Sequence, residues 1–369
     1  MIPVFEPIIE EDDIEAVVDA LRKGEVSGTF GDYIKDFEQE FAQYVGCKFG
    51  VLVNSGTSAL HLAVSALDID PGDEILVSAS TNIATALAAL HNGAVPVPVD
   101  SEKVTWNLDL DLLEDLITPR TRAIIPVHLY GHPVDMDRLM EIADKHNLAV
   151  IEDCAESHGA TVRGRMTGSF GDMACYSFYA NKVITTGEGG IITTNNEELA
   201  ERLRLLRNLA FTEPRFKHEK AGFNYRMPGF VAALGLSQLR KIEHILDEKR
   251  RVAQSYTEKL KDIPGLQLPV ELEWARNVYW MYALVVKPEF GISRDELMNA
   301  LDEKGIQTRT FFCPMNQQPV LQSQDGYKSV PCPVADGLWE NGLYLPSAWN
   351  LDEESLLLIS DVIHQAARS

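Results

Sequence analysis

The sequence is short of positive charge, of paired cysteines and of long apolar runs. Its 369 residues include 55 acidic and 33 basic side chains, which gives a formal net charge of −22. Nucleic acids and anionic membranes are bound by basic surfaces, so this charge argues against both as partners. A small anionic ligand stays compatible with it, because one local pocket of amides or cations can hold a phosphate.

The few cysteines exclude a disulfide framework. There are five of them and none forms a C-x-x-C pair, which is typical of reduced thiols, so we expect a cytoplasmic protein. The first residues, MIPVFEPIIEEDD, lack the basic flank and the apolar stretch of a signal peptide. No run reaches the roughly 18 apolar residues of a membrane span, so no membrane partner is expected.

Short apolar runs alternate with helical patterns from residue 45 to residue 195. The runs are GVLVN, EILVS, AVPVPVD, RAIIPVHL and LAVIEDC. Near-continuous apolar strands separated by helices predict an α/β fold with a mostly parallel sheet covered by helices on both faces. The segments GDMACYSFY and GGIITTNN are predicted as two further strands, joined by a loop that contains Lys182.

Two domains are expected. Residues 230–263 have helical spacing throughout and are predicted to link a large domain, residues 1–245, to a smaller C-terminal α/β domain, residues 246–369. In the smaller domain VYWMYALVVK is predicted as a strand and SRDELMNALDEKG as a capped helix. The N-terminal residues could pack on the smaller domain.

Ligands of open parallel sheets bind at the carboxyl ends of the strands. After the first strand comes SGTSAL, in which Gly56 lets the backbone approach a ligand. The amides of Thr57 and Ser58 open a helix there and suit a phosphate. An ordinary capped strand-to-helix turn is the alternative interpretation.

A carboxylate, Asp153, follows the buried run LAVIE. It is either a helix cap or the counterion of a cationic ring nitrogen, because an isolated charge is costly at such a place. A metal site built from Asp153, Glu156 and His158 would match no specific ligand spacing, and no metal is predicted.

Lys182 lies between the apolar ACYSFY and the glycine-rich TTGEGG. A solvated lysine is the ordinary interpretation. The buried flanks, with a phosphate site and a carboxylate at the same sheet edge, favour a lysine that forms a Schiff base with pyridoxal phosphate (PLP).

Together these motifs resemble the PLP-dependent nucleotide-sugar aminotransferases of the DegT/StrS group, which have fold type I. The resemblance covers nearly the whole chain, and its segments include GEVSGTFGDYIKDFEQEFAQYVG, NSGTSALHLAV, PVHLYGHPVDMD, IEDCAESHGA, SFYANKVITTGEGG, GFNYRMPGFVAALGLSQL and RTFFCPMNQQP. It implies transfer of an amino group from glutamate to a nucleotide-linked keto sugar. Members that aminate C4 of a GDP-linked 4-keto-6-deoxy sugar, the perosamine synthases, are especially similar around SFYANKVITTGEGG and RTFFCPMNQQP.

The resemblance also implies how PLP is held. Lys182 would carry the covalent link, Asp153 would pair with the pyridine nitrogen, and Glu156 would lie near the ring hydroxyl or the sugar. The phosphate would be held by one side chain and by backbone, namely by Ser177, Gly56, Thr57 and Ser58.

Two further positions bear on the cofactor. Asn224 would reach the phosphate from the second subunit of a homodimer with shared active sites. The family usually places an aromatic residue on the PLP ring, within a pattern like Thr-aromatic-Val/Ile-Ala-Thr, and here Asn82 stands in that place.

Two segments are expected to line the sugar pocket, VSGTFGDY (26–33) and RTFFCPMNQQP (309–319). An arginine can bind a diphosphate in bidentate fashion, and phenylalanine can cover the apolar face of a 6-deoxy sugar. The core of the small domain is the alternative place for Phe311 or Phe312. The predicted substrate contacts are Ser27, Phe30, His158, Arg309, Phe311 and Asn316.

Other functions remain as alternatives. The acceptor could be a 3-keto sugar, another keto sugar or a cyclitol. A PLP-dependent sugar dehydratase of this family carries histidine in place of the lysine, so Lys182 argues against it. A non-enzymatic regulator with the same fold is disfavoured by the negative charge, and a nicotinamide-dependent dehydrogenase by the absence of a G-x-G-x-x-G motif after the first strand.

Overall fold

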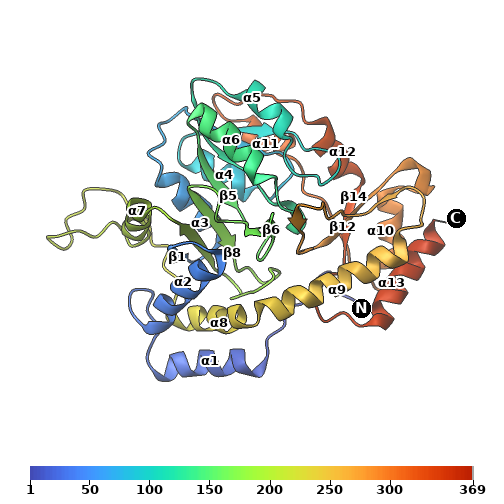
Figure 1. Cartoon of the computed structure of the whole chain (residues 1–369), viewed down its shortest axis with the longest axis horizontal. Coiled ribbons are helices and arrows are strands. Elements are labelled where there is room, and N and C mark those ends of the chain that lie inside the picture. Colours follow the sequence, from blue (N-terminus) through green and yellow to red (C-terminus); the bar gives the residue numbers. More distant parts are fainter. Residues whose placement is uncertain (368–369) are drawn as a thin grey trace.

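A seven-stranded sheet forms the centre of the computed structural model, which describes residues 1–367 (Figure 1). The strand order is β1-β9-β8-β5-β4-β2-β3, and only β9 runs antiparallel to its neighbours. The predicted α/β class with a mostly parallel mixed sheet is therefore confirmed. The strands are β1 (Phe49–Val53), β2 (Glu74–Ser78), β3 (Val95–Val99), β4 (Thr121–Ile125), β5 (Ala149–Asp153), β8 (Met173–Ser177) and β9 (Gly190–Thr194).

Helices cover both faces of this sheet. Successive strand residues point to opposite faces, so Val150 joins one core and Ile151 another. Because both faces are buried, the strands are nearly continuous apolar runs, as the sequence indicated. One face carries α3 (Gly56–Ser65), α4 (Ala84–His91) and α7 (Glu197–Arg207), and the other carries α2 (Asp32–Val45), α6 (Met136–His146) and α8 (Gly229–Arg240).

A second, antiparallel sheet of four short strands lies beyond α9 (Ile242–Leu260), in the order β10-β12-β14-β13. A capping box of Ser293 and Glu296 opens α10, as the sequence predicted. The predicted domain boundary at residue 245 falls within α9, and the division stays a prediction. The elements here are β10 (Leu266–Gln267), β12 (Tyr282–Val286), α10 (Arg294–Asp302), β13 (Arg309–Thr310), β14 (Gly342–Leu345) and α13 (Glu353–Ala366).

The sequence suggested one helical segment over residues 230–263, but two helices, α8 and α9, meet at Lys241. The N-terminal residues lie against this second sheet, since Ile2 bridges to Ile306 and the Val4 carbonyl accepts the Ser347 amide at 2.9 Å. The remaining elements are α1 (Glu11–Arg22), η1 (Leu110–Leu112), α5 (Leu113–Leu116), η2 (Leu129–Gly131), β6 (Thr161–Val162), β7 (Arg165–Met166), β11 (Ala275–Arg276), η3 (Pro288–Phe290), η4 (Met315–Gln317), α11 (Pro319–Gln322) and α12 (Pro333–Asn341).

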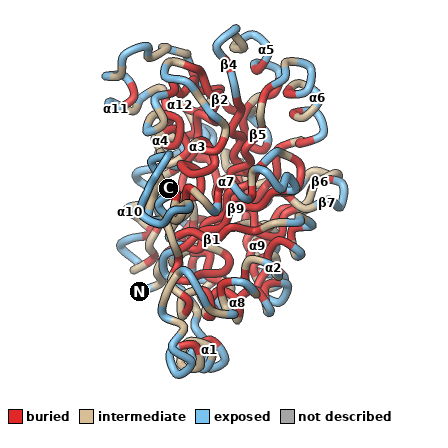
Figure 2. The backbone as a smooth tube through the Cα atoms, turned by 90° about the vertical axis from the view of Figure 1, so that its left-hand side faces the viewer, coloured by how far each residue is buried: buried red, intermediate tan, exposed pale blue. Residues whose placement is uncertain are grey.

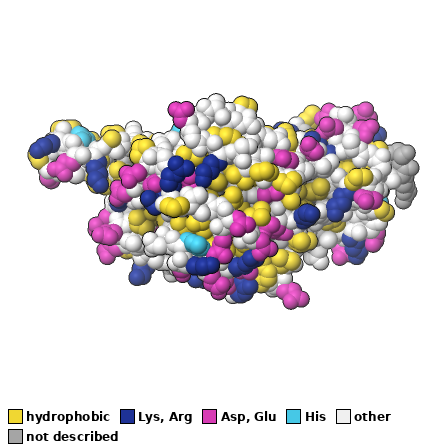
Figure 3. All heavy atoms as spheres, turned by 90° about the horizontal axis from the view of Figure 1, so that it is seen from above, with side chains coloured by type: hydrophobic (Ala, Val, Ile, Leu, Met, Phe, Trp, Pro, Cys, Tyr) yellow, Lys and Arg dark blue, Asp and Glu magenta, His cyan; other side chains and the backbone are white. Residues whose placement is uncertain are grey.

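Burial is concentrated in the sheets and the helices packed on them, whereas the loops and helix edges are exposed (Figure 2). Figure 3 shows acidic and basic side chains interspersed over one face of the molecule. No helix within residues 1–367 is long and apolar enough to cross a membrane. All five cysteines are free thiols.

Candidate active site

A cavity of about 390 Å³ opens where β1, β5 and β8 end. The loops after these parallel strands meet at one edge of the sheet, and the second sheet closes the cavity with aromatic side chains. The residues that line it are Ser55, Gly56, Thr57, Leu60, Thr81, Asn82, Ala84, Val127, Asp153, Ala155, Glu156, Ser177, Tyr179, Asn181, Lys182, Glu188, Trp280, Phe312 and Tyr344.

The N-terminus of α3 forms one wall. Ser55 caps the helix, because its Oγ accepts the Ser58 amide at 3.0 Å. Gly56 and Thr57 lie in the first turn of α3 and line the cavity. Backbone amides in a first turn have no acceptor within the helix, so these two are available as donors to a ligand. A Cβ on Gly56 would stand 2.7 Å from that of Ser177, so glycine is needed for the hydroxyl and the amides to converge. Such a cradle fits a phosphate.

The Asp153 carboxylate ends β5 and is 4% exposed. Its Oδ2 accepts the Thr85 hydroxyl at 2.8 Å and its Oδ1 accepts the Ala155 amide at 3.1 Å. Burial raises its pKa, and these donors and the positive charge of Lys182 act in the opposite direction. No lysine, arginine or histidine within residues 1–367 forms an ion pair with it. A buried carboxylate without such a partner suits a cationic ring nitrogen.

Glu156 and Lys182 line the same cavity, and the charge of each acts on the pKa of the other. The Glu156 Oε2 accepts the Tyr130 amide at 2.8 Å, and burial raises the pKa of this carboxyl group. Burial lowers the pKa of the Lys182 amine, while the charges of Glu156 and Asp153 oppose that change. A lowered pKa leaves more of the amine neutral, which a nucleophile or proton carrier requires.

A second lysine lies close behind. Lys249 of α9 is 7% exposed, and its Nζ donates to the Ser347 carbonyl at 2.7 Å. Burial lowers its pKa to about 7. It shares a cavity of about 20 Å³ with Lys182 and Asn181. Because Lys249 is also buried with a lowered pKa, it serves as a control for the prediction that Lys182 is the reactive lysine.

Asn82 lies at the cavity where the family places an aromatic residue, and its side chain accepts the Ala84 amide at 3.0 Å. The aromatic side chains come from elsewhere, namely Tyr179, Trp280, Phe312 and Tyr344. The pattern of VYWMYALVVK predicted only a strand and did not indicate that Trp280 lines the cavity. The one signal available was a tryptophan directly before the strand's apolar alternation.

Two predicted substrate residues lie in the core. Phe311 is 1% exposed and packs edge-on to Trp106 and Tyr130, and its neighbour Phe312 lines the cavity instead. His158 is fully buried among aromatic rings, and neither ring nitrogen has a hydrogen-bond partner within residues 1–367. Burial speaks against direct contact of Phe311 or His158 with a substrate.

The predicted substrate residues Arg309 and Asn316 also lie outside the lining of this cavity. Arg309 is exposed and donates to the Thr308 carbonyl at 2.8 Å. The Asn316 Nδ2 donates to Asp336 at 3.0 Å. In the cradle itself Ser58 is engaged locally, because its hydroxyl donates to Asn54 at 2.6 Å.

The 26–33 loop belongs to a different cavity, of about 350 Å³. Phe30 lines it together with Arg204, Arg207 and Arg226, and Ser27 lies in the same loop, its Oγ accepting the Thr29 amide at 3.2 Å. Asn224 is exposed and bridges to Asn208. None of these residues lines the cavity that contains Lys182.

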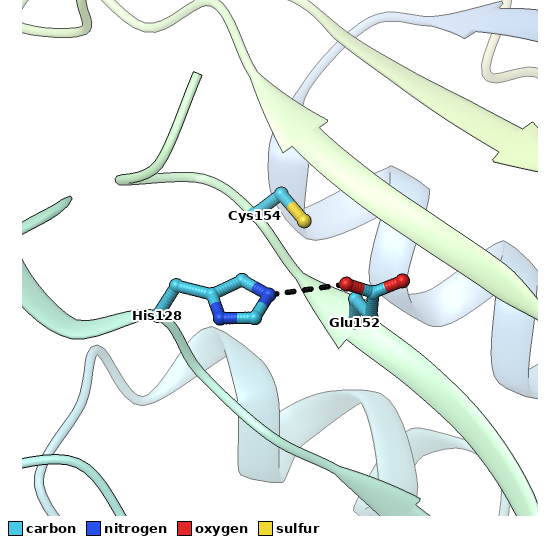
Figure 4. A group of neighbouring side chains, drawn as sticks. All are labelled: His128, Glu152 and Cys154. Atoms are coloured by element: carbon cyan, nitrogen blue, oxygen red, sulfur yellow. Dashed lines mark hydrogen bonds and ion pairs between the residues drawn. The ribbon is translucent and has the colours of Figure 1, made fainter. Parts of the chain in front are cut away.

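One buried group has metal-binding residue types, His128, Glu152 and Cys154 (Figure 4). The His128 Nδ1 accepts the Val134 amide at 3.1 Å, so its Nε2 donates to Glu152 at 3.2 Å. Glu152 also accepts three backbone amides, those of Gly168, Phe170 and Gly171. With these lone pairs engaged, the group anchors the 168–171 loop to β5.

Comparison with known proteins identifies the family. A model of the DegT/DnrJ/EryC1/StrS aminotransferase family matches residues 7–364. The chain belongs to this family. The predicted family, fold class and enzyme class are thereby confirmed.

Individual relatives match over nearly their full length. A GDP-perosamine synthase from Caulobacter vibrioides is 42% identical over 359 residues, covering 96% of this chain and 95% of the relative. A dTDP-3-amino-3,4,6-trideoxy-alpha-D-glucose transaminase from Streptomyces venezuelae is 39% identical, with coverages of 91% and 88%. A Streptococcus pneumoniae protein assigned as a sugar aminotransferase and solved in its PMP form is 28% identical, with a TM-score of 0.93 and coverages of 100% and 99%.

The burial of His158 predicts a pH dependence of stability. Burial lowers its pKa from 6.5 to about 3, so the unfolded chain binds a proton that the folded chain does not. The stabilisation is complete above pH 6.5 and is lost as the pH falls towards 3. Between about pH 7.5 and about pH 5.5, the cofactor-free protein should lose about 1 kcal/mol more free energy of unfolding than its His158→Leu variant. Urea unfolding at both pH values measures this, and equal losses would contradict it.

Proposed function

We propose that this protein is a PLP-dependent aminotransferase that moves an amino group from glutamate to a nucleotide-linked 4-keto-6-deoxy sugar and releases a 4-amino sugar nucleotide of the perosamine type. The convergence of Lys182, Asp153 and the N-terminus of α3 on one cavity carries the proposal. The name of the Caulobacter relative supports GDP as the nucleotide. The free cysteines are in keeping with a cytoplasmic location.

The cavity offers a partner for each polar part of the cofactor. PLP, when bound, supplies a reactive aldehyde carbon and a ring that accepts electrons. The Asp153 carboxylate would hold a proton on the ring nitrogen, and Thr85 and the Ala155 amide fix that carboxylate in place. The Ser177 hydroxyl and the amides of α3 bind the phosphate.

Lys182 is the group that holds and moves protons. Its neutral Nζ would hold PLP through the aldehyde carbon, with loss of water, and the desolvation that lowers the pKa of Lys182 favours that neutral form. With PLP and the amino donor bound, the same Nζ would be the group placed to take a proton from the donor's Cα. The negative charge of Glu156 then stabilises the ammonium form, because this carboxylate acts to raise the pKa of Lys182.

The alternative acceptors are a 3-keto sugar, another keto sugar or a cyclitol. The Streptomyces venezuelae relative is named for a 3-amino product on dTDP, so both the position and the nucleotide differ between relatives of similar identity. A dehydratase is disfavoured, because Lys182 is present where such enzymes carry histidine.

We also propose a homodimer with shared active sites. Residues 213–220, after α7, are exposed and irregular, and Phe216 is 74% exposed (Figure 1). Asn224 and the arginine-lined cavity with Phe30 have no role in their own subunit's Lys182 cavity. In a dimer they would complete the partner's site, where arginines suit a diphosphate.

The covalent role of Lys182 is tested by spectra of the purified protein. Wild type should show the visible absorbance band of bound PLP, and Lys182→Ala should lose that band and transamination while keeping the fold. Lys249→Met is the matched control and should keep both, because its amine hydrogen-bonds a carbonyl. A band that survives in Lys182→Ala and disappears in Lys249→Met would show that Lys249 forms the link and would contradict the assignment of Lys182.

Shared sites are tested by mixing two inactive variants, Lys182→Ala and Asn224→Asp. Heterodimers should carry one intact site, so activity should return to about a quarter of the wild-type value at equal mixing. Each variant alone serves as the control. If mass spectrometry of the intact assembly shows subunit exchange and activity does not return, Asn224 acts within its own subunit.

The nucleotide is tested by competition binding to the PLP-loaded protein. GDP should displace a fluorescent GDP conjugate at lower concentration than UDP or dTDP. A lower dissociation constant for dTDP or UDP would overturn the nucleotide assignment and leave the aminotransferase assignment standing.

A further inference from the structure

The Lys182 amine contacts the face of a tryptophan ring. Its Nζ lies 3.8 Å from the centroid of the Trp280 ring. The indole Nε1 donates to the Asn181 carbonyl at 2.7 Å, and Asn181 directly precedes the lysine. Trp280 therefore contacts the tip of Lys182 through its face and the backbone of the same loop through its edge.

Trp280 is fixed by a column of aromatic rings. Its ring stacks on Tyr130 at 6.2 Å and 13°, and Tyr130 stacks on Phe312 at 5.8 Å and 9°. Trp280 is 3% exposed and Tyr130 is 4% exposed. The column Phe312–Tyr130–Trp280 thus ends at the Nζ of Lys182, and its two outer rings, Phe312 and Trp280, line the cavity.

The backbone that carries this column is held in an uncommon conformation. Tyr130 has φ 53° and Tyr279 has φ 48°, both in the left-handed region that costs free energy outside glycine. Gly131 follows Tyr130 and packs against the segment of Tyr279, where a Cβ on it would lie 2.8 Å from the Tyr279 nitrogen. The Val278 amide donates to the Gly131 carbonyl at 3.2 Å. Packing at this junction fixes the column.

We propose that Trp280 is a positioning residue that holds the ammonium form of Lys182 against its ring face and holds the lysine loop through its N–H group. This rests on the proposed role of Lys182. The negative face of an indole attracts a cation, most strongly where water is excluded. Trp280 therefore partly offsets the desolvation of Lys182 without adding a charge to a cavity that already contains two buried carboxylates, Asp153 and Glu156.

The Trp280 ring affects the proton that Lys182 carries. The ring face stabilises the ammonium that forms when the amine accepts a proton, and it keeps the side chain at the cavity after displacement. Trp280 lies just before β12, so the ring that contacts the lysine is carried by the segment that leads into the second sheet.

The test measures the pKa of Lys182 in the full-length protein freed of cofactor. Reductive methylation consumes only the neutral amine, so its rate at Lys182, followed by peptide mass spectrometry across pH, gives the midpoint. Trp280→Leu should lower that midpoint by about 0.5–1.5 units, and Trp280→Phe should lower it less because a smaller ring face remains. Trp274→Leu is the matched control: it removes a ring that faces Arg163 at 5.5 Å and should leave the Lys182 midpoint unchanged.

An unchanged Lys182 midpoint in Trp280→Leu, with native circular dichroism, would overturn the proposal, as would an equal shift in Trp274→Leu. If Trp280→Leu does not fold, Trp280→Met replaces it, because the flexible methionine side chain fills an irregular cavity without a ring face. The midpoint is independent of turnover. A failure of the aminotransferase assignment would appear in the Lys182→Ala spectra instead, so the two failures are distinguishable.

Discussion

The burial of charged groups at the strand ends is the constraint on which the rest of the site depends. Asp153 is 4% exposed and Glu156 is 2% exposed, so both carboxylates have lost most of their hydration. That loss is costly unless fixed donors or a cation replace the water. Thr85 and the Tyr130 amide supply donors, and Lys182 supplies the positive charge. The same desolvation acts to lower the pKa of the lysine and so provides its reactivity.

The sheet topology explains why these groups meet. Parallel strands bring their carboxyl ends to one edge, which places Asp153 beside the cradle at Gly56. The single antiparallel strand, β9, makes the β8–β9 connection a hairpin, so the loop that carries Lys182 returns to the same edge. The second sheet then supplies Trp280 and Phe312, which close the cavity with apolar surface. The charged side chains, the phosphate cradle at Gly56 and the aromatic rings that close the cavity thus come from separate parts of the chain.

The sequence predicted what depends on local pattern and missed what depends on packing. Apolar runs with turn residues after them were enough to place the strands, and the position of Asp153 after one of them followed from chain order. Which of Phe311 and Phe312 faces the cavity depends on how β13 meets the sheet beside it, and periodicity does not contain that information. His158 lies in the core and Trp280 at the lysine because of contacts between residues far apart in the chain.

The most direct measurement of the central claim is peptide mapping of the wild-type protein after reduction with sodium borohydride in the presence of PLP. Reduction fixes the cofactor permanently to whichever amine holds it. The account predicts a phosphopyridoxyl group on the peptide that contains Lys182, at one group per chain, with Lys249 unmodified. A phosphopyridoxyl group on Lys249, or on no lysine, would contradict it.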